Sequence, residues 1–377
     1  MGNQNRYGDF IDNVSVAGVV SPGGERRGAI FGSPFVALVS GVKQTSVFLS
    51  SNSRAMSSFS GPARLLRLLG AAAAIVVAPL TQVDAQRTPN RARAVNAVSA
   101  ARREAVRAKL IARIAQVPGA QVGLSVRDLR TGQTLSIDGD TVFHAASTMK
   151  VPVLFALFRE FQSGRMKADR RVLLVNQFKS IVDSSVYTLS ASDDSDSSVY
   201  AMVGHEVQLR ELATRMITHS SNLATNALIS LLDPVRITDI TRTFGATQLM
   251  VRRGVEDNVA FRAGLNNTTT ANDLVALFSA LQRGQVAGKL ATNEMLAILE
   301  AQAFNDEIPA GLPTGTRIAH KTGSITATLH DAGIVYPPGR APYAIAVLTR
   351  NIKDGKVASA VIADCSRIVW EWLVPAK

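Results

Sequence analysis

Segments with the pattern of β-strands lie on both sides of a long helical region in this 377-residue chain. Gln121 to Leu129 alternates apolar and polar side chains, and Thr134 to Ile137 returns as its hairpin partner after a Thr131-Gly132 turn. Three more strands are predicted near the C-terminus, at Arg317 to Thr322, Gly333 to Tyr336 and Pro342 to Thr349. This order predicts an α+β or α/β fold, in which an antiparallel sheet built from both termini is flanked by helices and an all-helical lobe is inserted.

Most of the remaining segments repeat apolar residues with the period of a helix. The predicted helices span Ala94 to Ala115, Val151 to Phe161, Leu209 to Ile217, Leu223 to Leu232, Val235 to Phe244, Leu274 to Leu281, Asn293 to Gln302 and Val357 to Leu373. Pro152 lies inside the second of them, where it is expected to remove one backbone hydrogen bond and to bend the axis. The segment from Asp183 to Tyr200 is rich in serine and aspartate, and it is predicted to be a surface excursion.

The first 85 residues are predicted to lie outside the folded domain. Residues 1–55 show no sustained period and are interpreted as an upstream extension, with translation starting at Met56. Residues 56–85 combine arginines, an apolar run from Leu68 to Leu80 and a small-x-small site, which is typical of a secretory signal peptide; the alternative is an internal hydrophobic helix. A linker over 86–93 and a catalytic domain over 94–377 complete the predicted organisation. We therefore expect a secreted or periplasmic protein with no stable membrane anchor after signal cleavage.

The composition excludes several classes of partner and cofactor. The net charge is +12, but the basic residues are dispersed and form no tract interleaved with aromatics, so no nucleic-acid partner is expected. Cys365 is the only cysteine; it lies in an apolar helical pattern and is predicted to be a core residue. None of the five histidines has the spacing of a metal-binding pair, so neither a metal nor another cofactor is predicted. A monomer is the expected state.

Ser147 and Lys150 stand at the beginning of the helix predicted over Val151 to Phe161. Because they are three residues apart, their side chains share one face of that helix. A serine hydroxyl becomes a nucleophile when a base takes its proton, and a lysine is that base only when burial or a neighbouring cation lowers its pKa. For this short motif alone, the alternative is a capping serine beside a solvated lysine.

Two further motifs follow in order, Ser220-Ser221-Asn222 and then Lys321-Thr322-Gly323. Together with Ser147-Thr148-Met149-Lys150, this trio resembles the signature of the class A serine β-lactamases and the penicillin-binding D-alanyl peptidases. The resemblance covers Ala94 to Lys377 and implies the β-lactamase/transpeptidase-like fold. It also implies a small-molecule substrate, either a β-lactam or a D-Ala-D-Ala peptide.

The resemblance assigns catalytic roles to three residues of these motifs. Ser147 would attack the substrate carbonyl and form an acyl-enzyme. Lys150 would hold or receive its proton, and a glutamate-bound water is the alternative acylation base in the family. Ser220 would pass a proton to the departing nitrogen.

Substrate-binding roles fall to the other members of the motifs. The amide of Asn222 would donate to the substrate acyl carbonyl and accept from Lys150. The charge of Lys321 would favour the substrate carboxylate, which the Thr322 hydroxyl would also bind. The backbone N–H of Ser324, with that of the nucleophile, matches the family's oxyanion hole.

The sequence departs from the family pattern at three places. Ser221 stands where an aspartate is usual, which is expected to weaken local hydrogen bonding. The usual Glu-x-x-x-Asn is incomplete, because the residue four past Glu256 is Ala260. Glu256 is the best candidate for the base that hydrolyses the acyl-enzyme, with Asp257 next; the alternative for Glu256 is an ion pair with a nearby arginine. Asn267 replaces an aspartate that usually pairs with an arginine.

His330 lies where class A members often place an arginine-type contact to the substrate carboxylate. It is predicted to be a secondary substrate anchor, with a buried, hydrogen-bonded histidine as the alternative. The leading interpretation is a class A-like serine hydrolase that opens β-lactam rings through an acyl-enzyme on Ser147. The alternatives are a D-alanyl-D-alanine peptidase or esterase, a penicillin-binding sensor on the same fold, or a degenerate wall-binding module.

Overall fold

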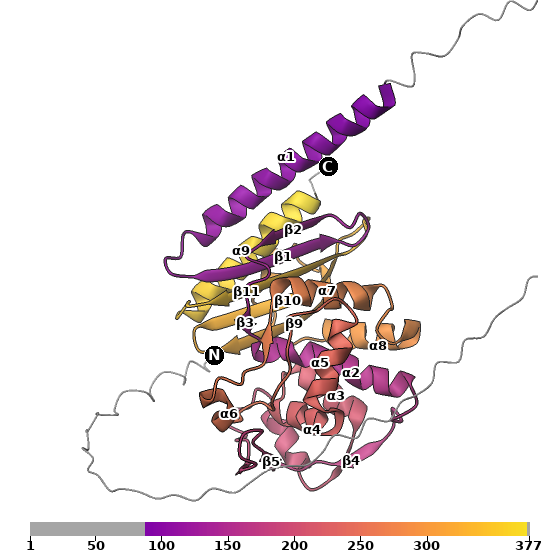
Figure 1. The fold of residues 1–377 in the computed structure, drawn as a ribbon, viewed down its shortest axis with the longest axis vertical. Coiled ribbons are helices and arrows are strands. Elements are labelled where there is room, and N and C mark those ends of the chain that lie inside the picture. Colours follow the sequence, from indigo (N-terminus) through magenta and orange to yellow (C-terminus); the bar gives the residue numbers. More distant parts are fainter. Residues whose placement is uncertain (1–86, 375–377) are drawn as a thin grey trace, which may run out of the picture. The chain divides into compact units, whose positions relative to one another are not determined.

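A five-stranded antiparallel sheet joins strands from the beginning and the end of the described chain (Figure 1). The computed structural model describes residues 87–374; the expected extension over 1–55 and signal peptide over 56–85 lie outside the described residues. The strand order is β2-β1-β11-β10-β9, with β1 Gln121–Asp128, β2 Thr134–Ile137, β9 Arg317–Ile325, β10 Thr328–Tyr336 and β11 Tyr343–Arg350. The predicted α+β architecture, with a sheet built from both ends and helices between, is confirmed.

The inserted region consists of helices and short two-stranded ribbons. The ribbons pair β3 Phe143–His144 with β8 Thr268–Thr269, β4 Arg171–Leu173 with β7 Glu206–Gln208, and β5 Phe178–Lys179 with β6 Val186–Tyr187. The α-helices are α1 Arg87–Ile114, α2 Lys150–Gln162, α3 Leu209–Thr218, α4 Asn222–Leu232, α5 Pro234–Arg242, α6 Asn258–Arg262, α7 Ala271–Gln282, α8 Gly288–Glu300 and α9 Gly355–Leu373. Three 3-10 turns are η1 Ala146–Met149, η2 Ser197–Met202 and η3 Pro309–Gly311.

The two faces of the sheet bury two separate cores, because successive side chains of a strand point to opposite faces. On the central strand β11, Tyr343, Ile345 and Val347 belong to the core that α9 covers, and Ala344, Ala346 and Leu348 belong to the core shared with the helical lobe. Figure 1 shows α9 along one face of the sheet and the lobe of α2 to α5 on the other side. Cys365 of α9 is fully buried in the first core, as predicted.

Helix α2 forms the centre of the helical lobe, and its run from Val151 to Phe158 is buried on every side. A helix buried all round needs no polar face, which explains the continuous apolar sequence. Pro152 lies in the first turn of α2, where backbone N–H groups have no intrahelical partner. Pro152 therefore costs α2 no intrahelical hydrogen bond, contrary to expectation.

Helix α1 begins at Arg87, so most of the stretch expected to be a linker over 86–93 is helical. Pro89 falls in the first turn of this helix, a position that proline tolerates. Helix α1 reaches the α9 side of the sheet through Leu110, which is fully buried. Within residues 87–374, no helix combines the length and the apolar character needed to cross a membrane.

The central position of α2 predicts a large difference between two leucine truncations. Leu154 in α2 is fully buried, whereas Leu290 in α8 is 87% exposed. We expect Leu154→Ala to lower the free energy of unfolding by about 3 kcal/mol or more, because it leaves a cavity. The control Leu290→Ala should change it by less than about 0.5 kcal/mol. Urea denaturation followed by circular dichroism measures both, and equal losses would contradict the burial of α2.

Candidate active site

Ser147 lies in the 3-10 turn η1, between the short strand β3 and helix α2. The preceding residue, Ala146, has a φ of 45°, which is a strained backbone conformation for a residue with a Cβ. Such strain persists only where surrounding structure enforces it, and it concentrates at functional sites. Ser147 itself is half-buried, while its neighbours Thr148 and Lys150 are fully buried.

Lys150 is enclosed at the start of α2, and its ammonium group points to the junction between α3 and α4. Its Nζ donates to the Ser220 backbone oxygen at 2.5 Å, to Ser220 Oγ at 3.1 Å and to Asn222 Oδ1 at 2.8 Å. These three acceptors match the three donors of a lysine. The sequence motifs that contain Ser147 and Ser220 are therefore joined through one buried side chain.

Lys321 reaches the same hydroxyl from the edge strand β9. Its Nζ donates to Ser220 Oγ at 3.1 Å and to the Thr322 backbone oxygen at 2.9 Å, and the side chain is fully buried. Ser220 has a φ of 59°, another strained position. Both lone pairs of the Ser220 hydroxyl accept from lysines, so its own hydrogen is left to donate to a third group.

The two lysines and Ser220 have an unusual electrostatic environment. Burial, together with the positive charge of Lys321, holds the pKa of Lys150 well below the ordinary lysine value, and the negative charges of Asp194 and Glu256 oppose this shift. Burial lowers the pKa of Lys321 to about 7, against the negative charges of Asp331 and Glu307. Both shifts favour the neutral amine, which is the form that a general base requires.

Glu256 lies on the other side of Asn222 from Lys150. The Asn222 amide nitrogen donates to Glu256 Oε1 at 2.9 Å, while its amide oxygen accepts from Lys150. Burial raises the pKa of the Glu256 carboxyl, and the hydrogen bond from Asn222 opposes that shift. Glu256 forms no ion pair with any residue from 87 to 374, so the alternative of an arginine partner is not observed.

The loop that carries Glu256 is fixed on both sides of that residue. Asn226 of α4 accepts from the Val255 N–H at 2.6 Å and donates to the Val255 oxygen at 2.9 Å. Asp257 caps α6 by accepting from the Ala260 N–H at 3.0 Å, and its other oxygen accepts from the Ile181 N–H at 3.0 Å. These bonds hold Glu256 at a φ of 63°. Because both oxygens of Asp257 are occupied by structural bonds, Asp257 is a poorer candidate base than Glu256.

Asn267 closes the base of the same loop with its amide group. Its Oδ1 accepts from the backbone N–H groups of Arg252 and Arg253 at 2.7 and 3.1 Å, and its Nδ2 donates to the Arg253 oxygen at 3.0 Å. The Asn267 backbone oxygen accepts from Ala145, two residues before the nucleophile. The neutral amide of Asn267 therefore holds the loop together through backbone groups, at the position where an aspartate that pairs with an arginine is usual in the family.

Strand β9 passes directly beside Ser147. A Cβ added to Gly323 would lie 2.9 Å from the Ser147 nitrogen and 3.0 Å from the Thr148 nitrogen, which is too close for any side chain. This approach puts the predicted oxyanion donor Ser324, the next residue of β9, near the Ser147 N–H. Thr322 precedes Gly323 and is buried, whereas Ser324 is exposed.

His330 occupies a structural position, which corrects the expectation of a substrate anchor. The ring is fully buried; Nε2 lies 2.8 Å from the His144 oxygen, and Nδ1 accepts from the Thr349 N–H at 3.2 Å. Burial lowers the pKa of His330 to about 4, so the ring is neutral at pH 7. A neutral ring with both nitrogens bonded to the backbone cannot bind a substrate carboxylate, and the alternative of a buried, hydrogen-bonded histidine holds.

Sequence reasoning missed Asp194, which lies in the serine- and aspartate-rich excursion. Its carboxylate accepts hydrogen bonds from the backbone N–H groups of Asn222 and Leu223. Tyr200, at the end of the same excursion, donates from its hydroxyl to Asp194 Oδ2 at 3.2 Å. The high aspartate content of the segment was the available signal, but nothing in the pattern indicated which aspartate turns inward.

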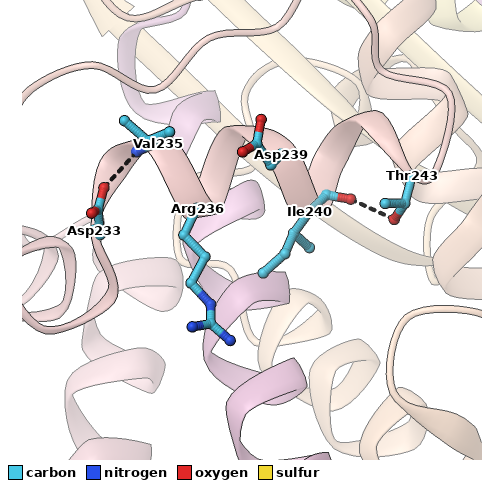
Figure 2. Close-up of a pocket in the computed structure, with 6 residues that line it drawn as sticks. All are labelled: Asp233, Val235, Arg236, Asp239, Ile240 and Thr243. Carbon is cyan, nitrogen blue, oxygen red and sulfur yellow. Dashed lines mark hydrogen bonds between the residues drawn. The ribbon is translucent and has the colours of Figure 1, made fainter. Parts of the chain in front are cut away.

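Other features of the described residues lie outside this constellation. No cluster of three or more histidine, cysteine or acidic side chains with the arrangement of a metal site occurs in residues 87–374. Figure 2 shows an open depression along α5, lined by Asp233, Val235, Arg236, Asp239, Ile240 and Thr243. Arg236 of this depression forms an ion pair with Glu160 of α2 at 2.7 Å. None of the lining residues belongs to the three motifs.

The fold and the three motifs agree with a family-level match. The model of the β-lactamase enzyme family matches residues 104–373. The chain therefore belongs to the β-lactamase enzyme family.

Individual relatives agree with this assignment. β-Lactamase AST-1 of Nocardia asteroides is 31% identical over 256 residues, which cover 67% of this chain and 78% of the relative. A mutant of PBP-A, solved as an acyl-enzyme complex with penicillin G, is similar with a TM-score of 0.62 and 27% identity, over 72% of this chain and 96% of that one. A mutant class A β-lactamase of the last common ancestor of Gram-negative bacteria is similar with a TM-score of 0.63 and 27% identity, over 72% and 100% of the two chains.

The contact between β9 and the nucleophile predicts that Gly323 tolerates no side chain. We expect Gly323→Ala to slow acylation by penicillin about 100-fold, because the added methyl group displaces β9 or the Ser147 backbone by a fraction of an ångström or more. Gly355→Ala is the control, since a Cβ there meets no atom within 4 Å. Stopped-flow measurement of acylation tests both variants, and a wild-type rate for Gly323→Ala would contradict the described approach.

Proposed function

We propose that this family member hydrolyses β-lactams as a class A-like serine β-lactamase, through an acyl-enzyme on Ser147. The observation that carries the proposal is the position of Ser220 Oγ, which is 3.1 Å from the Nζ atoms of both Lys150 and Lys321. Three motifs far apart in the sequence thereby meet beside one half-buried serine. No structural requirement of the fold explains two fully buried lysines on one hydroxyl, since burying a charge is costly.

Acylation begins when Ser147 Oγ attacks the lactam carbonyl and gives up its proton. Lys150 is one acceptor of this proton, because its lowered pKa makes the neutral amine accessible. Glu256 acting through a water molecule is the other, because Asn222 links both groups to the same site. The developing oxyanion would be bound by the N–H groups of Ser147 and Ser324.

Ring opening requires a proton on the departing lactam nitrogen. The Ser220 hydroxyl accepts from both lysines, so its hydrogen points away from them and can be donated. Lys150 or Lys321 then returns a proton to Ser220 Oγ along the existing hydrogen bond. The proton lost by Ser147 therefore reaches the nitrogen, and the C–N bond breaks as the Ser147 ester forms.

Hydrolysis of that ester requires a base for a water molecule. Glu256 is the candidate, because its half-buried carboxylate accepts from Asn222, lies near Lys150 and has no arginine partner within the described residues. A water deprotonated by Glu256 would attack the acyl carbon, and Ser147 would leave with the returned proton. The substrate carboxylate would meet the charge of Lys321 and the Thr322 hydroxyl.

The proposal includes the setting in which this reaction takes place. A signal peptide over 56–85 would export the chain to the periplasm or the medium, where β-lactams arrive. The catalytic domain would act as a monomer, without a metal, a nucleic-acid partner or a membrane anchor. The pattern of residues 56–85 supports export, and the dispersed basic residues support the absence of a nucleic-acid partner.

A second candidate function is a penicillin-binding enzyme or sensor that keeps its acyl group. The likeness to PBP-A, of which a mutant was solved as an acyl-enzyme complex with penicillin G, favours it. The two functions differ in one step, because both acylate Ser147 and only the β-lactamase releases the product rapidly.

Intact-mass measurement after addition of penicillin separates these functions. We expect the wild-type chain to gain the mass of one penicillin and lose it again, and Ser147→Ala to gain none. Glu256→Gln should retain the adduct at least about 100-fold longer, because the amide cannot deprotonate water. Glu371→Gln is the matched control and should release the adduct like the wild type, because Glu371 is exposed on α9, where it pairs with Arg367.

Each contrary result has a defined meaning. A wild-type adduct that persists would contradict the β-lactamase and favour the sensor or peptidase. Rapid release from Glu256→Gln would exclude Glu256 as the base. An adduct on Ser147→Ala would contradict the nucleophile.

A further inference from the structure

Asp194 brings a buried carboxylate from the excursion to the N-terminus of α4. Its Oδ1 and Oδ2 accept from the Asn222 N–H at 3.0 and 2.9 Å, and Oδ2 accepts from the Leu223 N–H at 2.9 Å. Ser221 Oγ lies 3.4 Å from the same oxygen. The residue is only 8% exposed. A carboxylate that leaves water is stabilised when several donors converge on it, as they do here.

The N-cap residue of α4 cannot satisfy these donors by itself. Ser221 is the N-cap, and its Oγ accepts from the Ala224 N–H at 3.2 Å. The N–H groups of Asn222 and Leu223, the first two residues of the helix, would otherwise have no partner. Asp194 provides the acceptor and places a negative charge at the positive end of the helix dipole. Asp194 therefore accepts from the two N–H groups at the beginning of α4 that the Ser221 side chain does not reach.

Asn222 is the residue through which this contact reaches the catalytic groups. Its side chain accepts from Lys150 and donates to Glu256, and its backbone is held by Asp194. We propose that Asp194 is a positioning residue of the active site: it fixes Asn222 between Lys150 and Glu256 and supplies a second negative charge to that pair. The inference rests on the proposed acylation of Ser147, and it connects Asp194 of the excursion to the catalytic groups.

The charges around Lys150 and Glu256 determine how the pH dependence of acylation should change when Asp194 is replaced. Lys150 faces Lys321, Asp194 and Glu256, and Glu256 faces Lys150, Asp194 and Asp193. The negative charge of Asp194 raises the pKa of both Lys150 and Glu256. Whichever of the two is the base, removal of this charge lowers the pKa of that base.

The Asp194 carboxylate has two further neighbours within its own segment. Tyr200 donates its hydroxyl to Oδ2, and burial together with Asp194 raises the pKa of Tyr200, so this phenol stays protonated. The Asp196 N–H donates to Oδ1 at 3.0 Å. Neither neighbour titrates as a base in the neutral range when Asp194 is replaced.

The test compares the pH dependence of acylation in Asp194→Asn and in a matched control. Asp196→Asn removes a carboxylate two residues away that is equally buried at 7% exposure, but that pairs with Arg215 at 3.0 Å instead of α4. The acylation rate constant with a chromogenic cephalosporin is measured from pH 4 to 9 on the full chain. Thermal melting of each variant reports whether it is folded.

For Asp194→Asn we expect the plateau rate to fall about 10-fold or more, because Asn222 loses its anchor. The acidic limb of the profile should move to lower pH by about half a unit or more, because the base has lost a neighbouring negative charge. Asp196→Asn should keep the wild-type limb even where its melting temperature falls. Should Asp194→Asn not fold, Asp194→Ser removes the same charge without placing an amide N–H against α4 and should show the same shift.

Two outcomes would overturn the inference. If a folded Asp194 variant keeps the acidic limb of the wild-type pH profile, Asp194 has only a structural role. An equal shift in Asp196→Asn shows a general effect of charge in the segment. Failure of the wild-type chain to acylate at any pH would instead overturn the proposed function, and the inference with it.

Discussion

Two buried lysines that share one serine hydroxyl determine the chemistry of this molecule. Lys150 and Lys321 are both fully buried, and both donate to Ser220 Oγ at 3.1 Å. Two ammonium groups so close and both fully buried repel each other, which favours loss of a proton from one of them. In the proposed mechanism this arrangement supplies both a base and an acid beside Ser147.

This arrangement requires the sheet and the helical lobe together. Strand β9 carries Lys321, helix α2 carries Lys150, and the junction of α3 and α4 carries Ser220. The two cores on either side of the sheet hold β9 in place, and the buried helix α2 fixes the direction of Lys150. Asp194 and Asn267 then tie two irregular segments, the excursion and the Glu256 loop, to the ends of these rigid elements. The precision of the site thus depends on backbone N–H groups that find acceptors far away in the sequence.

The periodicity of apolar residues and the order of the three motifs were enough to predict most of the fold and the centre of the site. The run Val151 to Phe158 has only apolar residues over two turns, which favoured a buried helix with Lys150 at its beginning. The predicted helix Val151 to Phe161 already placed Pro152 in its first turn, so the expected loss of a hydrogen bond came from applying the rule for helix interiors at the beginning of a helix. The anchor role expected of His330 came from the family resemblance, which indicates a position in the chain but not the backbone groups that surround the ring. Asp194 was missed because its segment has no periodic pattern from which the direction of a side chain could be predicted.

The most direct test of the shared hydroxyl is an NMR titration of lysine side chains labelled with 13C at Cε. The account predicts that Lys150 titrates well below the ordinary value of 10.5 and Lys321 near 7. It further predicts that Lys321→Met raises the pKa of Lys150, because a neighbouring positive charge has been removed. Two lysines that titrate at ordinary values, with Lys150 indifferent to the loss of Lys321, would contradict it.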